Sequence, residues 1–465
     1  MVISLLILCL FVVLSFEFVN GMNDTANAIA PVIYSHSLNP KKSVLIAAVF
    51  NFLGVMFGGT IVAMSIVHLL PLSIIVNQTA TFWVILVISI LISAIIWDLG
   101  AWYLALPVSS SHALIGSILG VSIAIMYSAA GVGFTPHWSK AQEVIIGLLI
   151  SPVIGFGLAL ILIYIAHAVL KKKEYFKAPF WSWDKPNIQM RSVLIIASGL
   201  VSFMHGKNDG QKWVGIATLI LVTLIPGSFA VNPDLNNSVI QEKVTTISTQ
   251  IAAIDVHALS TNDARMTTQI KKDLANLTLL LVNPDFDKLA VRKSILNIAD
   301  SYSNLDTVKQ NGLVPNVNAS ENITRPLINI KKDIDALAKT TDYVAWWIIV
   351  LVSIAIGSGT MIGWKRIVET IGEKIGKYKM NYSQAASSAL VTAGAIGMAS
   401  GLGLPVSTTH IMSSSVAGTM VEEHGWKNGV DPHMIKHILL AWILTMPTTI
   451  ILAASIFLIL KTIFV

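Results

Sequence analysis

The sequence contains few charged residues. Asp, Glu, Lys and Arg together make up 12% of its 465 residues, whereas 54% are hydrophobic. Soluble globular domains carry about a quarter charged residues, so this composition excludes an ordinary water-soluble enzyme. It excludes a disordered chain as well, because a disordered chain needs many more charges to stay solvated. The composition therefore predicts a polytopic membrane protein.

Cysteine is nearly absent, since Cys9 is the only one. A single thiol excludes an intramolecular disulfide and a cysteine-based zinc site. The formal net charge of +6 would suit a nucleic-acid partner, but the basic residues lie in short loops between apolar segments. That placement is typical of the cytoplasmic loops of membrane proteins, so we expect a lipid membrane and no nucleic acid as the partner.

Ten apolar segments are candidates for crossing the bilayer, which takes about 20 residues per helix. Residues 1–16 lack the preceding basic residues and the following cleavage motif of a signal peptide, so we expect a retained helix there. Two segments, 3–35 and 192–226, are too long for one straight crossing and are interrupted by polar residues. The candidates are 3–35, 43–69, 82–105, 108–131, 141–170, 192–226, 343–363, 383–404, 407–420 and 437–462.

The orientation follows from two loops rich in Lys and Arg, 171–191 and 364–380. Basic loops remain in the cytoplasm. Two crossings separate them, so the stretch between these crossings, 228–341, is predicted to be extracytoplasmic. The same parity places both termini outside the cytoplasm.

The stretch 228–341 has the composition of a water-exposed domain. Its apolar residues recur at helical spacing, as in Val244, Ile247, Ile251 and Ile254. We expect a small, mostly helical extramembrane insertion. The predicted domains are therefore a first membrane repeat, a basic linker, the start of a second repeat, the insertion and the rest of the second repeat, at residues 1–170, 171–191, 192–227, 228–341 and 342–465.

Two motifs occur twice. Residues 21–28 (Gly-Met-Asn-Asp-Thr-Ala-Asn-Ala) are echoed by 205–212 (His-Gly-Lys-Asn-Asp-Gly-Gln-Lys), and 107–112 (Pro-Val-Ser-Ser-Ser-His) by 405–410 (Pro-Val-Ser-Thr-Thr-His). The Asn-Asp motif and the Pro-Val motif lie 113 residues farther apart in the second copy than in the first. This difference is close to the length of the insertion. Because the two copies enter the membrane from opposite sides, the pattern predicts an inverted-repeat secondary transporter with an all-α fold.

Each Asn-Asp pair lies near the middle of an apolar segment. An ionised Asp at the bilayer centre costs about 2.5–3.5 kcal/mol, so Asp24 and Asp209 are expected to face the protein interior. Flanking glycines favour an unwound joint between half-helices in each segment. One such pair alone could equally be a hydrogen-bonded lock between helices. Its recurrence favours a role for Asp24, Asp209 and Asn23 in binding a cation or proton.

The Pro-Val motifs suit the start of a helix inside the membrane. Proline is favoured near helix starts, and Ser or Thr side chains cap the free amides there. Hydroxyls and the positive end of a helix dipole together make an anion site. Bonding between helices is the alternative, and the duplication favours the anion site. The candidate hydroxyls are those of Ser109, Ser110, Ser111, Ser407, Thr408 and Thr409.

Five further polar residues lie in apolar surroundings. His112 and His410 follow the Pro-Val motifs and are expected to contact the residues that bind the substrate, and not the substrate itself. Lys212 could neutralise Asp209 or attract an anion. Glu17 and Asp98 are intramembrane acids without a counterpart in the other repeat, and a structural hydrogen bond and proton transfer are equally open for them.

These motifs resemble the inorganic phosphate transporters of the Pit type. The similarity includes Phe-Asn-Phe-Leu-Gly-Val at 50–55 and Gly-Thr-Met-Ile-Gly-Trp at 359–364, and covers nearly all of the membrane part. The sequence looks most like the bacterial low-affinity, proton-coupled branch. One departure is Asn51, which stands where sodium-coupled animal members carry a Glu.

The resemblance implies symport of phosphate with protons by alternating access. It implies that phosphate travels as a neutral complex with a divalent metal such as Mg²⁺, that arsenate is carried as an analogue, and that no cofactor is permanently bound. Asn27, Asn208 and Gln211 would line the substrate site beside the hydroxyls. No metal ligands of the protein itself are predicted, and a homo-oligomer is left open.

Three alternatives remain beside proton symport. A sodium-coupled carrier would use the same scaffold, and a passive anion channel would use the same hydroxyls and helix starts. A membrane-embedded hydrolase would need metal-ligand spacing or a nucleophile–base motif, and neither occurs among His112, His410 and the acids. The sequence therefore predicts a transporter and not an enzyme.

Overall fold

The computed structural model describes most of the chain, namely residues 2–67, 79–128, 138–170, 172–179, 184–233, 237–283, 286–306 and 330–464. Over these residues the chain is helical, and its only extended pairing is an isolated β-bridge between Gly376 and Val430. The chain forms two compact units. The first comprises Met1–Leu70, Thr81–Ala217 and Trp346–Val465, and the second comprises Pro71–Ala80 and Thr218–Ala345.

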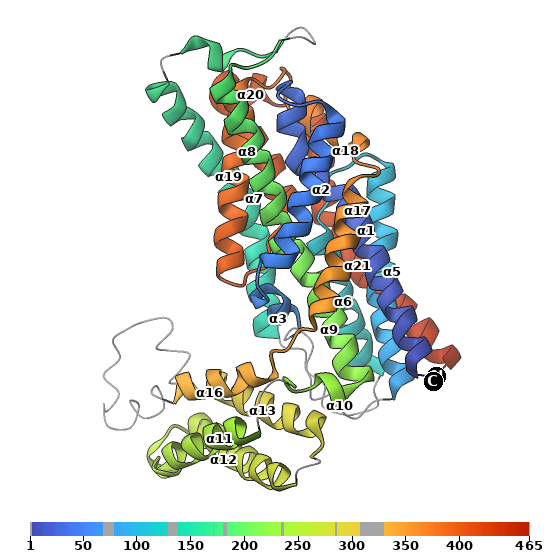
Figure 1. Ribbon diagram of the computed structural model, residues 1–465, viewed down its shortest axis with the longest axis vertical. Helices are drawn as coiled ribbons and strands as arrows, with labels where there is room; N and C mark the ends of the chain where they lie inside the picture. The colour runs from blue at the N-terminus through green and yellow to red at the C-terminus, as the bar shows by residue number, and fades with distance from the viewer. Residues whose placement is uncertain are drawn as a thin grey trace. The chain divides into compact units, whose positions relative to one another are not determined.

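Long helices running roughly side by side dominate the first unit (Figure 1). Seven helices in the described part of the chain are long and apolar enough to cross a membrane. The main helices are α1 (Val2–Tyr34), α2 (Pro40–Phe57), α3 (Ile61–Val67), α5 (Ala80–Tyr103), α6 (Ser110–Ser128), α7 (Trp138–Val169), α8 (Ile188–His205), α9 (Gln211–Leu224, which continues into the second unit), α17 (Trp346–Thr360), α18 (Lys365–Glu369), α19 (Tyr382–Gly401), α20 (Thr408–Gly429) and α21 (Pro432–Phe464).

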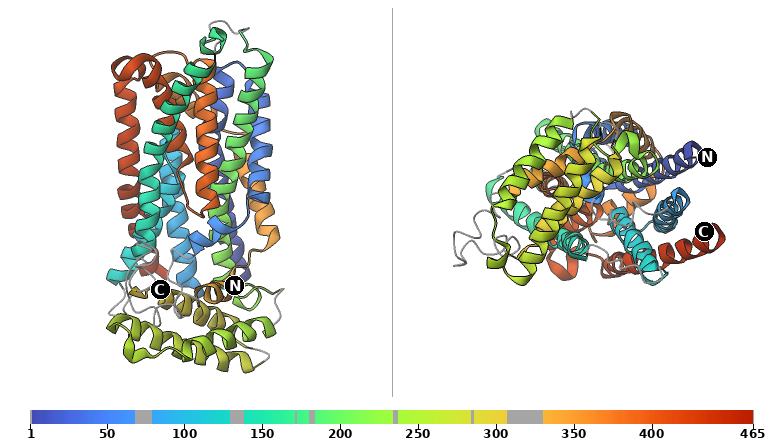
Figure 2. Two further views of the ribbon diagram at one scale, coloured as in Figure 1. Left: turned by 90° about the vertical axis from the view of Figure 1, so that its left-hand side faces the viewer. Right: turned by 90° about the horizontal axis from the view of Figure 1, so that it is seen from below.

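Short helical turns complete the first unit at η1 (Lys173–Phe176), η2 (Gly206–Gly210) and η5 (Thr370–Lys374). The closest helix pairs are α7 with α20, α6 with α21, α1 with α17 and α8 with α19. Figure 2 shows that α1 begins and α21 ends at the same end of this bundle.

Two helix pairs turn within the bundle at the duplicated Pro-Val motifs. Residues 104–109 join α5 to α6, and residues 402–407 join α19 to α20. The Ser109 hydroxyl accepts a hydrogen bond from the His112 amide (3.2 Å), and Ser407 accepts one from His410 (3.1 Å). These caps define the starts of α6 and α20, as the sequence predicts. Both helices are buried over their first turns, so their hydroxyls contact protein groups and not lipid.

The predicted unwound joint is wrong for the first repeat, because α1 is a continuous helix from Val2 to Tyr34. Its motif has one glycine, Gly21, and a single glycine costs a helix only about 1 kcal/mol. This glycine also serves packing, because a Cβ there would lie 2.5 Å from the Ile356 carbonyl oxygen of α17. In the second repeat, with two flanking glycines, the chain widens into the π-helical turn η2 between α8 and α9 and does not unwind.

The second unit consists of amphipathic helices around a core of their own. They are α10 (Pro226–Phe229), α11 (Asn237–Ala252), η3 (Val256–Ala258), α12 (Thr261–Val282), α13 (Lys288–Ser303), α16 (Lys331–Ala338) and η4 (Lys339–Thr341). Val244, Ile247 and Ile251 lie on α11, Ile254 follows it, and all four are buried in this core, in agreement with their helical spacing. The predicted insertion, 228–341, falls within the stretch Thr218–Ala345 of this compact unit, and its exact boundaries stay a prediction.

A buried arginine joins the two ends of the second unit. Arg292 of α13 is 1% exposed, and its Nη1 donates to the carbonyl oxygens of Ala230 (3.0 Å) and Thr341 (2.5 Å). Burial lowers the pKa of Arg292 to about 10, and the nearby Asp342 counteracts this shift. The guanidinium therefore stabilises this unit mainly through the two carbonyls that it satisfies.

We expect Arg292→Met to destabilise the second unit by about 2–3 kcal/mol, because two buried carbonyls lose a charged donor. The measurement is the rate at which a protease cleaves within 218–345 in the full-length protein in detergent. Arg265→Met is the matched control, since Arg265 is exposed and, among the described residues, its side chain hydrogen-bonds Asn262 (3.3 Å). Equal cleavage rates for the two variants would contradict this role of Arg292.

Candidate transport site

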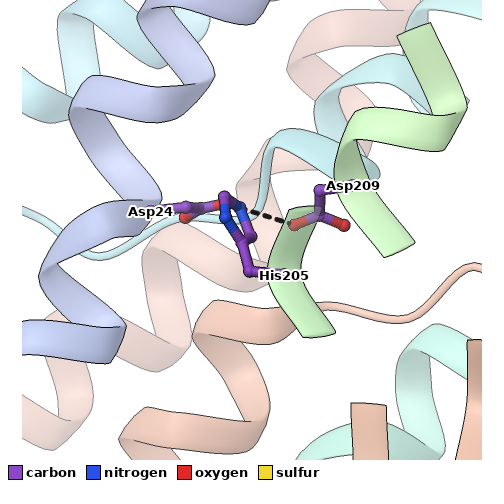
Figure 3. A group of neighbouring side chains, drawn as sticks. All are labelled: Asp24, His205 and Asp209. Atoms are coloured by element: carbon purple, nitrogen blue, oxygen red, sulfur yellow. Dashed lines mark ion pairs between the residues drawn. The ribbon is translucent and has the colours of Figure 1, made fainter. Parts of the chain in front are cut away.

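Two buried carboxylates from the two Asn-Asp motifs meet inside the first unit. Asp24 comes from α1 and Asp209 from η2. The Thr408 hydroxyl, in the first turn of α20, lies 3.0 Å from Asp209 Oδ2 and 3.4 Å from Asp24 Oδ2. His205 lies between the same two oxygens, with its Nε2 3.1 Å from Asp209 and 3.6 Å from Asp24 (Figure 3). The site therefore combines two acids, an imidazole and a hydroxyl.

The turn η2 brings His205 and Asp209 together. They are four residues apart, and the turn aims both side chains toward Asp24 (Figure 3). The turn packs tightly against α2: a Cβ on Gly206 would lie 2.2 Å from the Asn51 carbonyl oxygen. Only glycine fits at such an approach, so the second motif is fixed against α2. The Asn51 side chain then holds His205, with Oδ1 2.9 Å from Nδ1.

Each Asp motif is bonded to the Pro-Val motif of the other repeat. The Thr409 hydroxyl donates to Asp24 Oδ1 (2.6 Å), and Asn27 Nδ2 donates to both Thr409 Oγ1 (3.0 Å) and Asp24 Oδ1 (3.3 Å). At the corresponding place in the other repeat, the Lys212 ammonium donates to Asp209 and to Ser111. Asn27 and Lys212 both stand three residues after their Asp, and Thr409 and Ser111 are equivalent in their motifs. The structure thus brings together Asp24, Asp209, Asn27, Lys212, Ser111, Thr408 and Thr409.

Asn23 and Asn208 have a different place. Asn208 donates to the Leu404 carbonyl (3.1 Å) and accepts from the Val406 amide (3.2 Å), so it fixes the turn before α20. Asn23 donates to the Asp98 carbonyl of α5 (3.2 Å). Both residues therefore attach an Asp motif to the helix pair of its own repeat, and hydrogen-bond none of the groups that surround the two carboxylates.

In the described ranges, the remaining predicted residues make no hydrogen bond to the two carboxylates. Ser109 and Ser407 cap α6 and α20. The buried Ser110 hydroxyl has no hydrogen-bond partner among the described residues. Gln211 donates to the Val55 carbonyl of α2 (2.9 Å).

His112 and His410 lie behind the Pro-Val motifs. Their rings approach at a centroid distance of 4.4 Å, and His410 stacks on Trp442 at 3.9 Å. Both line an apolar cavity of about 670 Å³ whose walls include α7, α20 and α21. No hydrogen bond joins either imidazole to Asp24 or Asp209 within the part of the chain that the structure describes.

The sequence predicts no metal ligands, yet the structure assembles a possible cation site. One ligand atom each of Asp24, His205 and Asp209 lies within 4.8 Å of the others. Carboxylate oxygens and an imidazole can hold a metal ion or exchange a proton. His205 was not singled out from the sequence. Its signal was its place directly before Gly206, four residues ahead of Asp209, where the first motif has Asn20.

Comparisons with known proteins agree with this architecture. The model of the phosphate transporter family matches residues 20–453. The low-affinity inorganic phosphate transporter of Buchnera aphidicola subsp. Acyrthosiphon pisum is 37% identical, over 97% of this chain and 96% of the relative. The low-affinity inorganic phosphate transporter PitB of Escherichia coli (strain K12) is 35% identical, with the same coverage.

A solved structure, described as the sodium-dependent phosphate transporter, shares the fold. Its TM-score is 0.55 at 20% identity, with 99% of this chain and 100% of that chain covered. Together with the apolar helices, these findings confirm the prediction of an all-α, multi-pass membrane protein, and the family is one of transporters and not of enzymes. The chain belongs to the phosphate transporter family.

Proposed function

We propose that this protein carries inorganic phosphate across the inner membrane together with protons. The observation that carries the proposal is a crossed cluster of Asp24, Asp209, Asn27, His205, Lys212, Ser111, Thr408 and Thr409. In it Asp24 is bonded to Thr409 of the second Pro-Val motif, and Asp209 is linked through Lys212 to Ser111 of the first. The names of the relatives, low-affinity inorganic phosphate transporters, supply the substrate class.

Phosphate would bind at the starts of α6 and α20. The first amides of a helix have no partner within the helix and favour an anion. The buried Ser110 hydroxyl, which lies beside the Asp98 carboxyl, could turn to donate to such an anion, and Lys212 supplies a positive charge beside Ser111. Ser111, Thr408 and Thr409 would exchange their present bonds for bonds to phosphate oxygens.

Asp24 and Asp209 would couple this binding to a cation. An anion beside two buried carboxylates is repelled unless protons or a metal ion neutralise them. Asp24, His205 and Asp209 are close enough together to share a divalent ion, which suits phosphate entering as a neutral complex with Mg²⁺. Arsenate has the same tetrahedral oxygens and would be carried as an analogue.

Transport would proceed by alternating access. Because the cluster crosses between two predicted inverted repeats, movement of one repeat against the other must rearrange these hydrogen bonds. Neutralising the carboxylates weakens their hold on Lys212 and His205 and so permits that movement. In this arrangement both termini and residues 228–341 are extracytoplasmic, and loops 171–191 and 364–380 are cytoplasmic.

Sodium coupling is the second candidate, because the solved neighbour is described as sodium-dependent. The residue Asn51 favours proton coupling over sodium coupling. Its amide donates to Thr360 (3.0 Å) and its oxygen contacts the ring of His205. A Glu at this position would place a further negative charge beside His205 and strengthen a metal-cation site, whereas the neutral Asn does not.

We expect Asp209→Asn to abolish phosphate accumulation while the protein still inserts, because the amide cannot take up a proton and no longer pairs with Lys212. The measurement is uptake of radiolabelled phosphate by cells that lack other phosphate carriers, with membrane insertion checked in parallel. Asp335→Asn, at an exposed acid of α16, is the control. Normal accumulation by Asp209→Asn would remove the carboxylate from the coupling mechanism.

We expect Ser110→Ala combined with Thr408→Ala to raise the phosphate concentration for half-maximal uptake by roughly tenfold or more. Each hydroxyl bond to a charged oxygen contributes about 1.5–3 kcal/mol. The control is Ser192→Ala with Thr462→Ala, two exposed hydroxyls that bond only to their own helix backbones. An unchanged concentration dependence would place the phosphate site elsewhere.

A further inference from the structure

A second buried acid lies on α1, away from the crossed cluster. Glu17 is fully buried, and its Oε2 accepts a 3.1 Å hydrogen bond from Asn20 Nδ2. The other oxygens of this pair, Glu17 Oε1 and Asn20 Oδ1, have no hydrogen-bond partner among the described residues. The pair therefore makes one hydrogen bond and keeps two buried acceptor oxygens without a donor.

The Glu17–Asn20 pair belongs to the same face of α1 as the transport site. Glu17, Asn20, Asp24 and Asn27 are spaced by three and four residues, which aligns them along one side of a helix. Glu17 lies about 10 Å along the axis from Asp24. It also abuts the second motif, because a Cβ on Gly210 would lie 3.4 Å from Glu17 Oε1.

Three charged groups of the second motif interact electrostatically with Glu17. They are His205, Asp209 and Lys212, all of them members of the crossed cluster. The helix α17 packs along α1 and contains no titratable side chain. The titratable side chains of α2 are Lys41 and Lys42, both in its first turn. The charge of Glu17 is therefore felt mainly at the transport site.

A proton bound to Glu17 would supply the donor that the Glu17–Asn20 pair lacks. An ionised carboxylate is an acceptor only, so it leaves both free oxygens buried without a donor, which is unfavourable for each of them. A protonated carboxyl is also a donor, and the amide oxygen of its own partner, Asn20, is an available acceptor. A metal ion would need several oxygen ligands, whereas this pair offers one carboxyl and one amide.

We infer that Glu17 is a second proton-binding site, which loads the coupling proton ahead of the Asp24–Asp209 cluster. The inference rests on the proposed proton-coupled phosphate transport. The carboxylate takes up one proton to become the neutral acid paired with Asn20, and it returns that proton after the bundle has rearranged. In the predicted topology α1 starts on the extracytoplasmic side, so a proton from that side reaches Glu17 before Asp24.

The test is Glu17→Gln in proteoliposomes, because Gln keeps the size and the amide pairing but cannot release a proton. Two processes are measured: phosphate exchange at equal pH and equal phosphate on both sides, and accumulation driven by an imposed proton gradient. We expect exchange within about twofold of the unmodified protein. Accumulation should fall to equilibration, a loss of about tenfold if one proton per phosphate is driven by about one pH unit.

A pH dye inside the vesicles reports proton entry with phosphate, which should be lost in Glu17→Gln. The matched control is Ser15→Ala, also on α1, whose hydroxyl bonds the Phe11 carbonyl of the same helix and no other group in the described part of the chain. Unchanged accumulation by Glu17→Gln would overturn the inference. Loss of exchange together with accumulation, in protein as well folded as Ser15→Ala, would overturn it too.

Glu17→Asp keeps the inference testable if Glu17→Gln does not fold. The shorter acid still takes up a proton, so proton entry should persist while the pH dependence of accumulation shifts. An unshifted pH dependence would overturn the inference. Failure of the proposed function itself is distinct, because the unmodified protein would then show no proton-driven accumulation at all.

Discussion

The rest of the structure depends on the burial of two carboxylates, Asp24 and Asp209, inside a membrane protein. A buried charge needs donors close by, and here Thr409 donates to Asp24, Thr408 and Lys212 donate to Asp209, and Lys212 also reaches Ser111 of the other Pro-Val motif. Thr408 reaches both acids, so one hydroxyl at the start of α20 links the two motifs. Other features of the fold, such as the early caps of α6 and α20 and the close packing at Gly206, hold these donors in place.

This crossed arrangement explains how a small change in charge could produce a large movement. The bonds between the repeats are mostly charge-assisted, and they weaken when a carboxylate takes up a proton or a cation. Lys212 and His205 would then be released from Asp209, and the phosphate oxygens offer them a new partner. Binding of anion and cation together thus favours the rearrangement, whereas either alone leaves a charge uncompensated.

Much of this could be predicted from the sequence, because the chemistry is expressed in duplicated motifs. The apolar segments, the capped starts of α6 and α20 and the burial of Asp24 and Asp209 in the protein interior all follow from spacing and residue type. The course of α1 was predicted wrongly, since one glycine, Gly21, costs the helix too little to interrupt it, and its close packing against α17 is not visible in the sequence. The place of Gln211, which turns toward α2, and that of His205, which joins the carboxylates, depend on the π-helical turn η2, and no local pattern indicates that turn.

The most direct test of the account is uptake of radiolabelled phosphate into proteoliposomes under an imposed proton gradient, in sodium-free buffer with and without Mg²⁺. The account predicts accumulation against the phosphate gradient without sodium, abolished by an uncoupler and increased by Mg²⁺. Accumulation only under a sodium gradient would contradict the proton coupling. Equilibration without accumulation under every gradient would contradict the symporter and indicate a passive anion channel.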